Sequence, residues 1–258
     1  NGANRWVKLL PGLTFQPSEL ARIVLVLWIA DRCVRLGDQL LDFRTGLLPM
    51  LLVWSACLLV SIIIHELGHS LAFRSCGIES SIVLYHFGGM AIPGRSRTTD
   101  HSSGGLSPLQ NIWISLAGPL AQLGSGVLVV VAVKLAGYQL IFFGSIPQVF
   151  KLIPSLVEGN AIDSPGLLIL ITFYIYPSIF WALLNLLPVM PLDGGQVMRS
   201  CVQLSGGNIL QALWVSVIVA GAVGFYGFAY GETYLGILFL MLGWTNFQTI
   251  QQSNRMGY

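Results

Sequence analysis

The sequence predicts an all-α, polytopic membrane protein with about six transmembrane helices. Of its 258 residues, 54% are hydrophobic and only 9% are charged, and the mean hydropathy is +0.73. A soluble domain carries about 25% charged residues, so this chain has too few charges to solvate a large aqueous domain. The lipid bilayer is therefore its expected surrounding. The net charge of +2 is too small to indicate nucleic-acid binding.

The first predicted segment comprises residues 1–46. Trp6 beside Arg5 and Lys8 is typical of a membrane interface. The apolar run over residues 20–34 is interrupted by charged side chains. Because crossing a bilayer takes roughly 20 apolar residues, this run is either a marginal span or an interfacial helix.

The next apolar run, residues 47–73, is the first strong span, and it contains His65-Glu66-x-x-His69. On a helix this spacing puts both imidazoles on one face, one turn apart, where they can bind Zn²⁺ together. Glu66 is then placed to act as a general base on a water held by the metal. The alternative is a pair of core histidines with a stray glutamate. A central acidic or basic group costs about 2.5–3.5 kcal/mol in a bilayer, so the setting favours the metal site.

The rest of the chain divides into a short β element and four further spans. Residues 81–89 are rich in β-formers and close on a glycine pair, which predicts a short strand or hairpin at the membrane surface. The further spans are expected at residues 109–133, 166–187, 209–230 and 234–250. Pro177 is expected to kink the second of these. A long loop over residues 134–165 precedes that kinked span.

A proline-rich segment follows the kinked span, and it reads Asn185-Leu-Leu-Pro188-Val-Met-Pro191-Leu-Asp193-Gly194-Gly195. The prolines end the helix, so we expect an irregular segment that offers Asp193 from an unwound backbone. Irregular backbone at membrane depth is tolerated only where it is buried in protein or lines a cavity. The plainer interpretation is a helix exit with a turn aspartate. His65, His69 and Asp193 together predict a catalytic zinc site with a fourth position open for water.

Topology supports this ligand set. The metal motif and Asp193 both lie toward the C-terminal ends of spans that run in the same direction, so both face the same side. With six spans, that side holds seven basic residues: Arg5, Lys8, Arg74, Arg95, Arg97, Arg199 and Arg255. The other side holds five: Arg32, Arg35, Arg44, Lys134 and Lys151. The excess predicts that the site faces the cytoplasm.

The first 50 residues resemble a piece of the SEDS family, the polytopic cell-wall glycan polymerases of bacterial division and elongation. The resemblance rests on Gly2-Ala3-Asn4-Arg5-Trp6, Phe15-Gln16-Pro17-Ser18-Glu19-Leu20-Ala21 and Gly46-Leu47-Leu48-Pro49. It ends before the segments that carry that family's catalytic aspartate, so no catalytic residue is implied. The first domain is therefore residues 1–46, a SEDS-like segment, and the second is residues 47–258.

Residues 47–250 resemble the site-2 protease family of intramembrane zinc metalloproteases. The matching motifs are His65-Glu66-x-x-His69, Asn185-x-x-Pro188-x-x-Pro191-Leu192-Asp193-Gly194, Phe87-Gly88-Gly89 and Ser115-x-Ala-Gly118-Pro119. The resemblance implies a zinc metalloendopeptidase with one Zn²⁺ per chain. Its expected reaction is hydrolysis of a peptide bond within or near a transmembrane helix of a single-span membrane protein, as in regulated intramembrane proteolysis. The expected location is the bacterial inner membrane.

The same resemblance implies roles for residues around the metal. Asn185 is expected to position the substrate or its oxyanion, and Phe87, Gly88 and Gly89 are expected to contact the substrate. The sequence contains no PDZ insertion, so a regulatory module is expected on a partner chain, if there is one. The competing interpretation is a catalytically inactive relative that serves as a membrane scaffold or binds partners.

Overall fold

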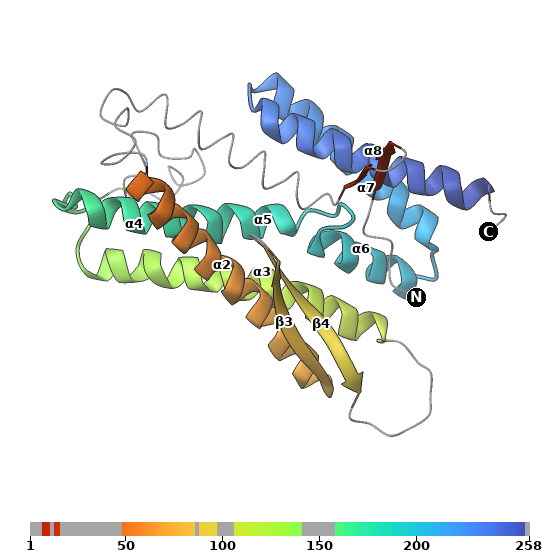
Figure 1. Ribbon diagram of the computed structural model, residues 1–258, viewed down its shortest axis with the longest axis horizontal. Coiled ribbons are helices and arrows are strands. Elements are labelled where there is room, and N and C mark those ends of the chain that lie inside the picture. Colours follow the sequence, from red (N-terminus) through yellow and green to blue (C-terminus); the bar gives the residue numbers. More distant parts are fainter. Residues whose placement is uncertain are drawn as a thin grey trace. The chain divides into compact units, whose positions relative to one another are not determined.

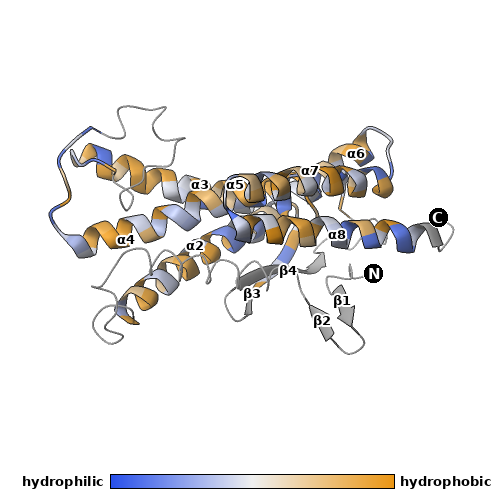
Figure 2. Cartoon of the chain, turned by 90° about the horizontal axis from the view of Figure 1, so that it is seen from above, coloured by the Kyte–Doolittle hydropathy of each residue, from blue (hydrophilic) through white to orange (hydrophobic). Residues whose placement is uncertain are grey.

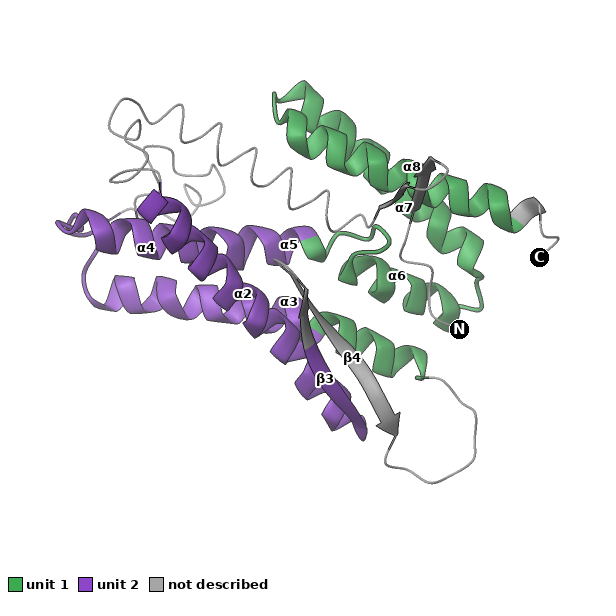
Figure 3. Ribbon diagram, in the orientation of Figure 1, with its two compact units in different colours: residues 1–42, 102–116, 185–258 green, residues 43–101, 117–184 purple. Residues whose placement is uncertain are grey.

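The computed structural model in Figure 1 describes residues 7–10, 13–15, 48–85, 88–96, 106–140 and 158–255. The chain divides into two compact units (Figure 3). Unit 1 comprises residues 1–42, 102–116 and 185–258, and unit 2 comprises residues 43–101 and 117–184. The expected marginal span at residues 20–34 lies outside the described residues. Within the first 46 residues, β1 (Val7–Leu10) pairs antiparallel with β2 (Leu13–Phe15).

Unit 2 is built around α2 (Leu48–Ser75), which carries the metal motif. Its buried face consists mainly of small and polar residues three or four positions apart: Ser61, His65, Gly68, His69 and Ala72. Seven of its large apolar side chains are exposed instead, from Ile63 at 37% to Leu52 at 63%. Lipid can cover such an apolar surface, whereas the polar face must be enclosed by protein. The helix is thus a candidate membrane span whose polar side chains, including both histidines, face the protein interior.

A β-hairpin-like pair follows α2. Gly77, at a φ of 77°, ends the helix turn and leads into β3 (Ile78–Tyr85), which pairs antiparallel with β4 (Gly88–Ser96). Both strands contact α2. The hydroxyl of Ser80 in β3 lies 2.7 Å from that of Ser70 in α2, so the first strand is tied to the residue after His69.

The remaining helices of unit 2 are most of α3, then α4 and the short segments that follow α4. Most of α3 (Pro108–Leu135) belongs to this unit. It is followed by α4 (Pro165–Tyr176), whose N-cap Ser164 accepts a hydrogen bond from Leu167 N–H. At Pro177, where we expected a kink, the α-helix changes to a π-helical segment, η5 (Pro177–Trp181), before the short α5 (Ala182–Asn185). Proline cannot supply the backbone N–H that a regular α-helix needs, and π-turns of this kind occur often at functional sites.

Unit 1 contains α6 (Asp193–Leu204), α7 (Ile209–Ala229) and α8 (Thr233–Arg255). A capping box of Asn208 and Gln211 starts α7. The tight turn at Gly231 returns the chain, and α7 and α8 then pack closely through glycines. A Cβ on Gly227 would lie 2.6 Å from the backbone nitrogen of Gly236. Small residues of this kind allow membrane helices to approach closely.

The expectation that Asp193 lies on an unwound backbone is wrong in one respect. Residues 186–192 are irregular as predicted, but Asp193 is the first residue of α6. An aspartate is favourable in the first turn of a helix because it faces the positive end of the helix dipole. Gly194 and Gly195 do not unwind the helix either. A Cβ on Gly194 would lie 2.1 Å from the carbonyl oxygen of Leu186, so the glycines let the first turn pack against the loop.

Four of the described helices are long and apolar enough to cross a membrane: Leu48–Ser75, Pro108–Leu135, Pro165–Asn185 and Ile209–Ala229. Figure 2 shows hydrophobic residues along these helices and more hydrophilic ones toward the end of α8. Helix α8, which we expected to span over residues 234–250, is not among the four. The protein is thus an integral membrane protein, and six crossings are not established by the described residues.

Candidate metal centre

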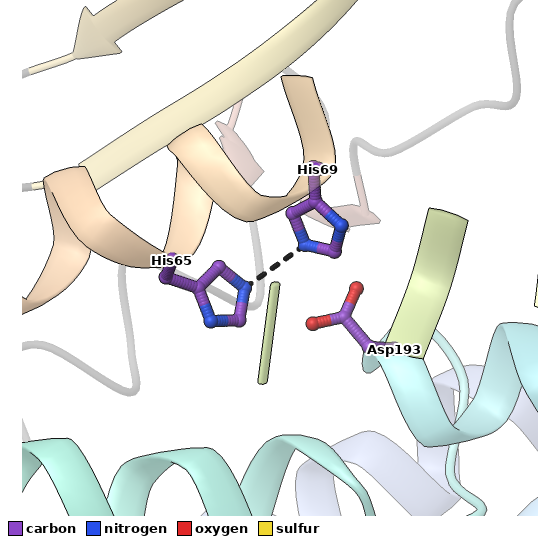
Figure 4. A group of neighbouring side chains, drawn as sticks. All are labelled: His65, His69 and Asp193. Carbon is purple, nitrogen blue, oxygen red and sulfur yellow. Dashed lines mark hydrogen bonds between the residues drawn. The ribbon is translucent and has the colours of Figure 1, made fainter. Parts of the chain in front are cut away.

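The two histidines of α2 turn their ring nitrogens toward each other (Figure 4). His65 is 7% exposed and His69 is 9% exposed. Their Nε2 atoms lie 3.0 Å apart, and the rings meet edge to face with centroids 4.7 Å apart. The spacing of four residues produces this arrangement because it puts both side chains on one face of the helix.

This pair fits a zinc ion. Two imidazole nitrogens bound to one tetrahedral zinc at about 2.0–2.1 Å are separated by about 3.3 Å. The observed 3.0 Å between the two Nε2 atoms is close to that separation. Small ring rotations would therefore suffice for both histidines to bind the same ion through Nε2.

The other nitrogen of His65 is held by a residue of α3. His65 Nδ1 lies 2.9 Å from Oε1 of Gln122, whose side chain is completely buried. Histidines that bind metals almost always make such a bond through the second ring nitrogen, which fixes the orientation of the ring.

Glu66, the expected general base, follows His65 directly in α2. It is 8% exposed, so its carboxyl group is kept from solvent within a candidate membrane span. A buried acidic group in that setting is expensive, and its usual explanation is function.

Two glycines, Gly68 in α2 and Gly118 in α3, let these helices approach each other closely beside the histidines. A Cβ on Gly118 would lie 2.3 Å from Nε2 of His69, and a Cβ on Gly68 would lie 2.4 Å from the carbonyl oxygen of Ala117. Any side chain at these positions would clash with the ring or push the two helices apart. The glycines therefore allow α3 to pack directly against the metal-motif face of α2.

The loop before Asp193 is fixed within unit 1 through Met190. The Met190 N–H donates to Ser216 Oγ at 3.1 Å, and Asn246 Nδ2 donates to the Met190 carbonyl oxygen at 2.8 Å. Both partners are buried, in α7 and α8 respectively. These two bonds replace the helical hydrogen bonds that the prolines of the loop interrupt.

Asp193 belongs to a group that could hold a metal ion. Among the described residues, His65, His69 and Asp193 offer ligand atoms that all lie within 4.8 Å of one another (Figure 4). Two imidazoles and one carboxylate form a donor set known from catalytic zinc sites. The histidines are in unit 2 and Asp193 is in unit 1.

The residues expected to contact substrate are less fully described. Asn185 is the last residue of α5 and is partly buried. Gly88 and Gly89 open β4, where they pair with Tyr85 and Leu84. Phe87 lies outside the described residues.

Gln122, Ser61 and Ser178 were not recognised in the sequence as part of the site. Gln122 Nε2 donates to Ser61 Oγ at 2.8 Å, and Ser61 Oγ lies 3.0 Å from Ser178 Oγ. Residues that are widely separated in sequence meet in this network. The sequence could have identified them in one way: each is a polar residue within an apolar span, where a polar side chain needs a partner.

Comparison with known proteins finds two families. Residues 1–92 match the model of the cell cycle protein family of FtsW, RodA and SpoVE. A probable peptidoglycan glycosyltransferase FtsW from Geobacter sulfurreducens is 38% identical over 87 residues, which are 34% of this chain and 22% of that protein. The resemblance of the N-terminal segment to cell-wall polymerases is thus confirmed for that part of the chain.

The second family covers most of the chain, because residues 53–226 match the model of peptidase family M50. The putative zinc metalloprotease sll0528 of Synechocystis is 31% identical over 214 residues, which are 79% of this chain and 47% of that protein. The putative zinc metalloprotease Rip3 of Mycobacterium tuberculosis is 24% identical over 89% of this chain and 54% of its own length.

The chain therefore spans about half the length of these two metalloprotease relatives. Among solved structures, the site-2 protease from Methanocaldococcus jannaschii aligns with a TM-score of 0.46 and 16% identity, over 95% of this chain and 94% of that one. On the strength of the family-model match over residues 53–226, the chain belongs to peptidase family M50.

Proposed function

We propose that this chain is an intramembrane zinc metalloprotease of the site-2 type, with His65, His69 and Asp193 as zinc ligands and Glu66 as general base. The observation that supports it most is the pair of imidazoles whose Nε2 atoms lie 3.0 Å apart on the buried face of an apolar helix. The match to peptidase family M50 supports the same reaction class.

Each residue has a distinct task. His65 and His69 would hold the ion from α2, and Asp193 would supply a carboxylate from the start of α6. Zinc, when bound, lowers the pKa of water and polarises a carbonyl group. Glu66 would accept the proton of the attacking water and pass a proton to the leaving amine as the peptide bond breaks.

The proposed substrate is a membrane-spanning helix of another protein with a single span. In such a helix each carbonyl is hydrogen-bonded to the N–H four residues later, so the helix must unwind locally before water can attack. The hairpin β3–β4 follows the metal-motif helix directly and could pair with the unwound segment, with Gly88 and Gly89 at its tip. The amide of Asn185 would donate a hydrogen bond to the substrate carbonyl oxygen.

The setting follows from the same proposal. The FtsW-like N-terminal segment favours a bacterial inner membrane, and the distribution of basic residues favours a cytoplasmic-side active site. Regulated intramembrane proteolysis is the process in which such an enzyme would act, with a regulatory partner on another chain.

The variant Glu66→Gln tests the reaction directly. It retains the size of the side chain but removes its basicity, so zinc should stay bound while cleavage of a single-span test substrate falls by about 100-fold or more. Glu232→Gln is the matched control, since Glu232 is an exposed glutamate in the turn between α7 and α8. This variant should cleave the test substrate as the wild type does. Wild-type-like cleavage by the Glu66→Gln variant would remove Glu66 from the mechanism. A zinc-loaded wild-type protein that cleaves no membrane substrate would favour the non-catalytic scaffold instead.

A further inference from the structure

Gln122 is a completely buried carboxamide inside the apolar helix α3, and its side chain makes hydrogen bonds with α2 and with the π-helical segment. Its Oε1 faces His65 Nδ1 at 2.9 Å. Its Nε2 faces Ser61 Oγ at 2.8 Å and the carbonyl oxygen of Pro177 at 3.4 Å. A buried amide with this many partners is costly to leave unsatisfied, so its orientation is well determined.

The partners of Gln122 fix the direction of each bond. The carbonyl of Pro177 can only accept, so the NH₂ end of the amide must face it. The carbonyl end then faces His65, and a carbonyl oxygen can also only accept. His65 Nδ1 must therefore carry the proton and donate it to Gln122.

This direction determines what His65 offers on its other side. A neutral imidazole with its proton on Nδ1 has a lone pair on Nε2, the nitrogen 3.0 Å from His69 Nε2. We infer that Gln122 is the positioning residue of the metal centre: it selects the His65 tautomer that can bind a metal through Nε2 and holds the ring in place. Its effect on metal binding rests on the function proposed above, whereas its effect on the tautomer does not.

The π-helical segment η5 contributes to the hydrogen-bond network that holds Gln122. Ser178 and the carbonyl group of Pro177, both in η5, meet Ser61 and the amide of Gln122 in one network. Through Gln122, the break in regular helix at Pro177 is thus connected to the orientation of His65. The network joins three helical elements of unit 2 and makes Gln122 rigid before any metal arrives.

Nitrogen NMR of the metal-free wild-type protein with ¹⁵N-labelled histidine tests the tautomer directly. At a pH where the histidines are neutral, His65 should carry its proton on Nδ1, and the signal is assigned by its loss in His65→Ala. A proton on Nε2 of His65 would overturn the inference, whether or not the protein binds zinc.

Metal affinity provides the second measurement. Gln122→Met has a similar length but cannot accept from Nδ1, so the affinity for zinc should fall about 10- to 100-fold, as for other outer-shell partners of metal-binding histidines. Gln122→Glu keeps an acceptor for Nδ1 and should bind zinc more tightly than Gln122→Met.

Ser125→Ala is the matched control for a merely structural role. The hydroxyl of Ser125, also in α3, donates to the backbone carbonyl oxygen of Gln122 at 2.7 Å and accepts from the Tyr174 hydroxyl at 2.9 Å, and neither bond involves the side-chain amide of Gln122. This variant should lower stability while zinc affinity stays close to that of the wild type. Equal losses of zinc affinity in Gln122→Met, Gln122→Glu and Ser125→Ala would show that Gln122 only supports the fold, and would overturn the positioning role.

Discussion

At the level of single residues, the proposed metal centre depends on how closely α3 approaches His69. A Cβ at Gly118 would lie 2.3–2.7 Å from three atoms of the imidazole, Nε2, Cε1 and Cδ2. No real side chain tolerates such contacts, so the ring would have to rotate away. The orientation of His69 is therefore set as much by an absent methyl group on α3 as by its own position on α2.

Gly118→Ala should lower the affinity for zinc by about 10-fold or more, the scale seen when the surroundings of a metal ligand are disturbed. Helix propensity cannot cause this loss, because Ala favours a helix over Gly by up to about 1 kcal/mol. Gly124→Ala is the control on the same helix, since a Cβ there meets nothing within 4 Å. Its zinc affinity should be unchanged and its resistance to unfolding equal or higher. Competition with a chelator measures the zinc affinity of both variants, and denaturant unfolding measures their stability. Equal zinc affinities in the two variants would contradict this account of Gly118.

The sequence predicted the residues of the motif but not the surroundings that make them work. His65, Glu66 and His69 follow from a spacing within one helix. The partner of His65 is Gln122, 57 residues away, and only packing of α2 against α3 brings the two together. In the sequence, Gln122 is one polar residue in an apolar run, and nothing local identifies what it contacts.

At the level of elements, the loop over residues 186–192 depends on α7 and α8. Met190 is held through both its N–H and its carbonyl group, by Ser216 and Asn246. The loop leads directly into Asp193, the proposed third ligand, at the start of α6. These contacts therefore fix the position of the backbone just before Asp193.

Asn246→Leu should destabilise the protein by about 1–3 kcal/mol, because it leaves the Met190 carbonyl oxygen without its buried donor. We also expect weaker zinc retention, since the loop before Asp193 is loosened. Thr249→Ala on the same helix is the control, because Thr249 is exposed and bonds only within α8 in the described contacts. Denaturant unfolding and zinc titration follow the two effects. Zinc retention and stability both equal to the wild type would show that the loop does not need this contact.

The long helices could be predicted from the sequence, and α6 could not. The spans expected at residues 47–73, 109–133 and 209–230 agree with α2, α3 and α7 to within two residues at each end. These boundaries follow from apolar runs and from the glycines and prolines around them. Helix α6 was missed because two glycines follow Asp193, and glycine in a helix normally argues against it. Here close packing of the first turn on the loop requires them.

At the level of the whole molecule, two family matches overlap on one chain. Residues 1–92 match the cell cycle protein family, and residues 53–226 match peptidase family M50. The metal motif and Asp193 both lie in the second range. The first 44 residues hold six of the thirteen basic residues but none of the proposed catalytic groups.

Deletion of residues 1–44 should therefore keep the zinc and measurable proteolysis in detergent, with a lower yield and mixed topology. The loss of yield follows from the loss of basic residues that orient the chain in the membrane. A plain apolar span with the same flanking charges should restore the yield. A deletion variant that is folded and zinc-loaded but wholly inactive would mean that the segment binds or admits substrate.

The central claim is that His65, His69 and Asp193 hold one catalytic zinc ion, and metal analysis of the purified protein tests it most directly. We expect about one equivalent of zinc per chain, in line with a site of three protein ligands. His65→Ala and Asp193→Ala should each lose most of it, while Asp163→Ala, which removes an exposed aspartate, should keep it. Full zinc retention in both His65→Ala and Asp193→Ala would contradict the assignment of the ligands.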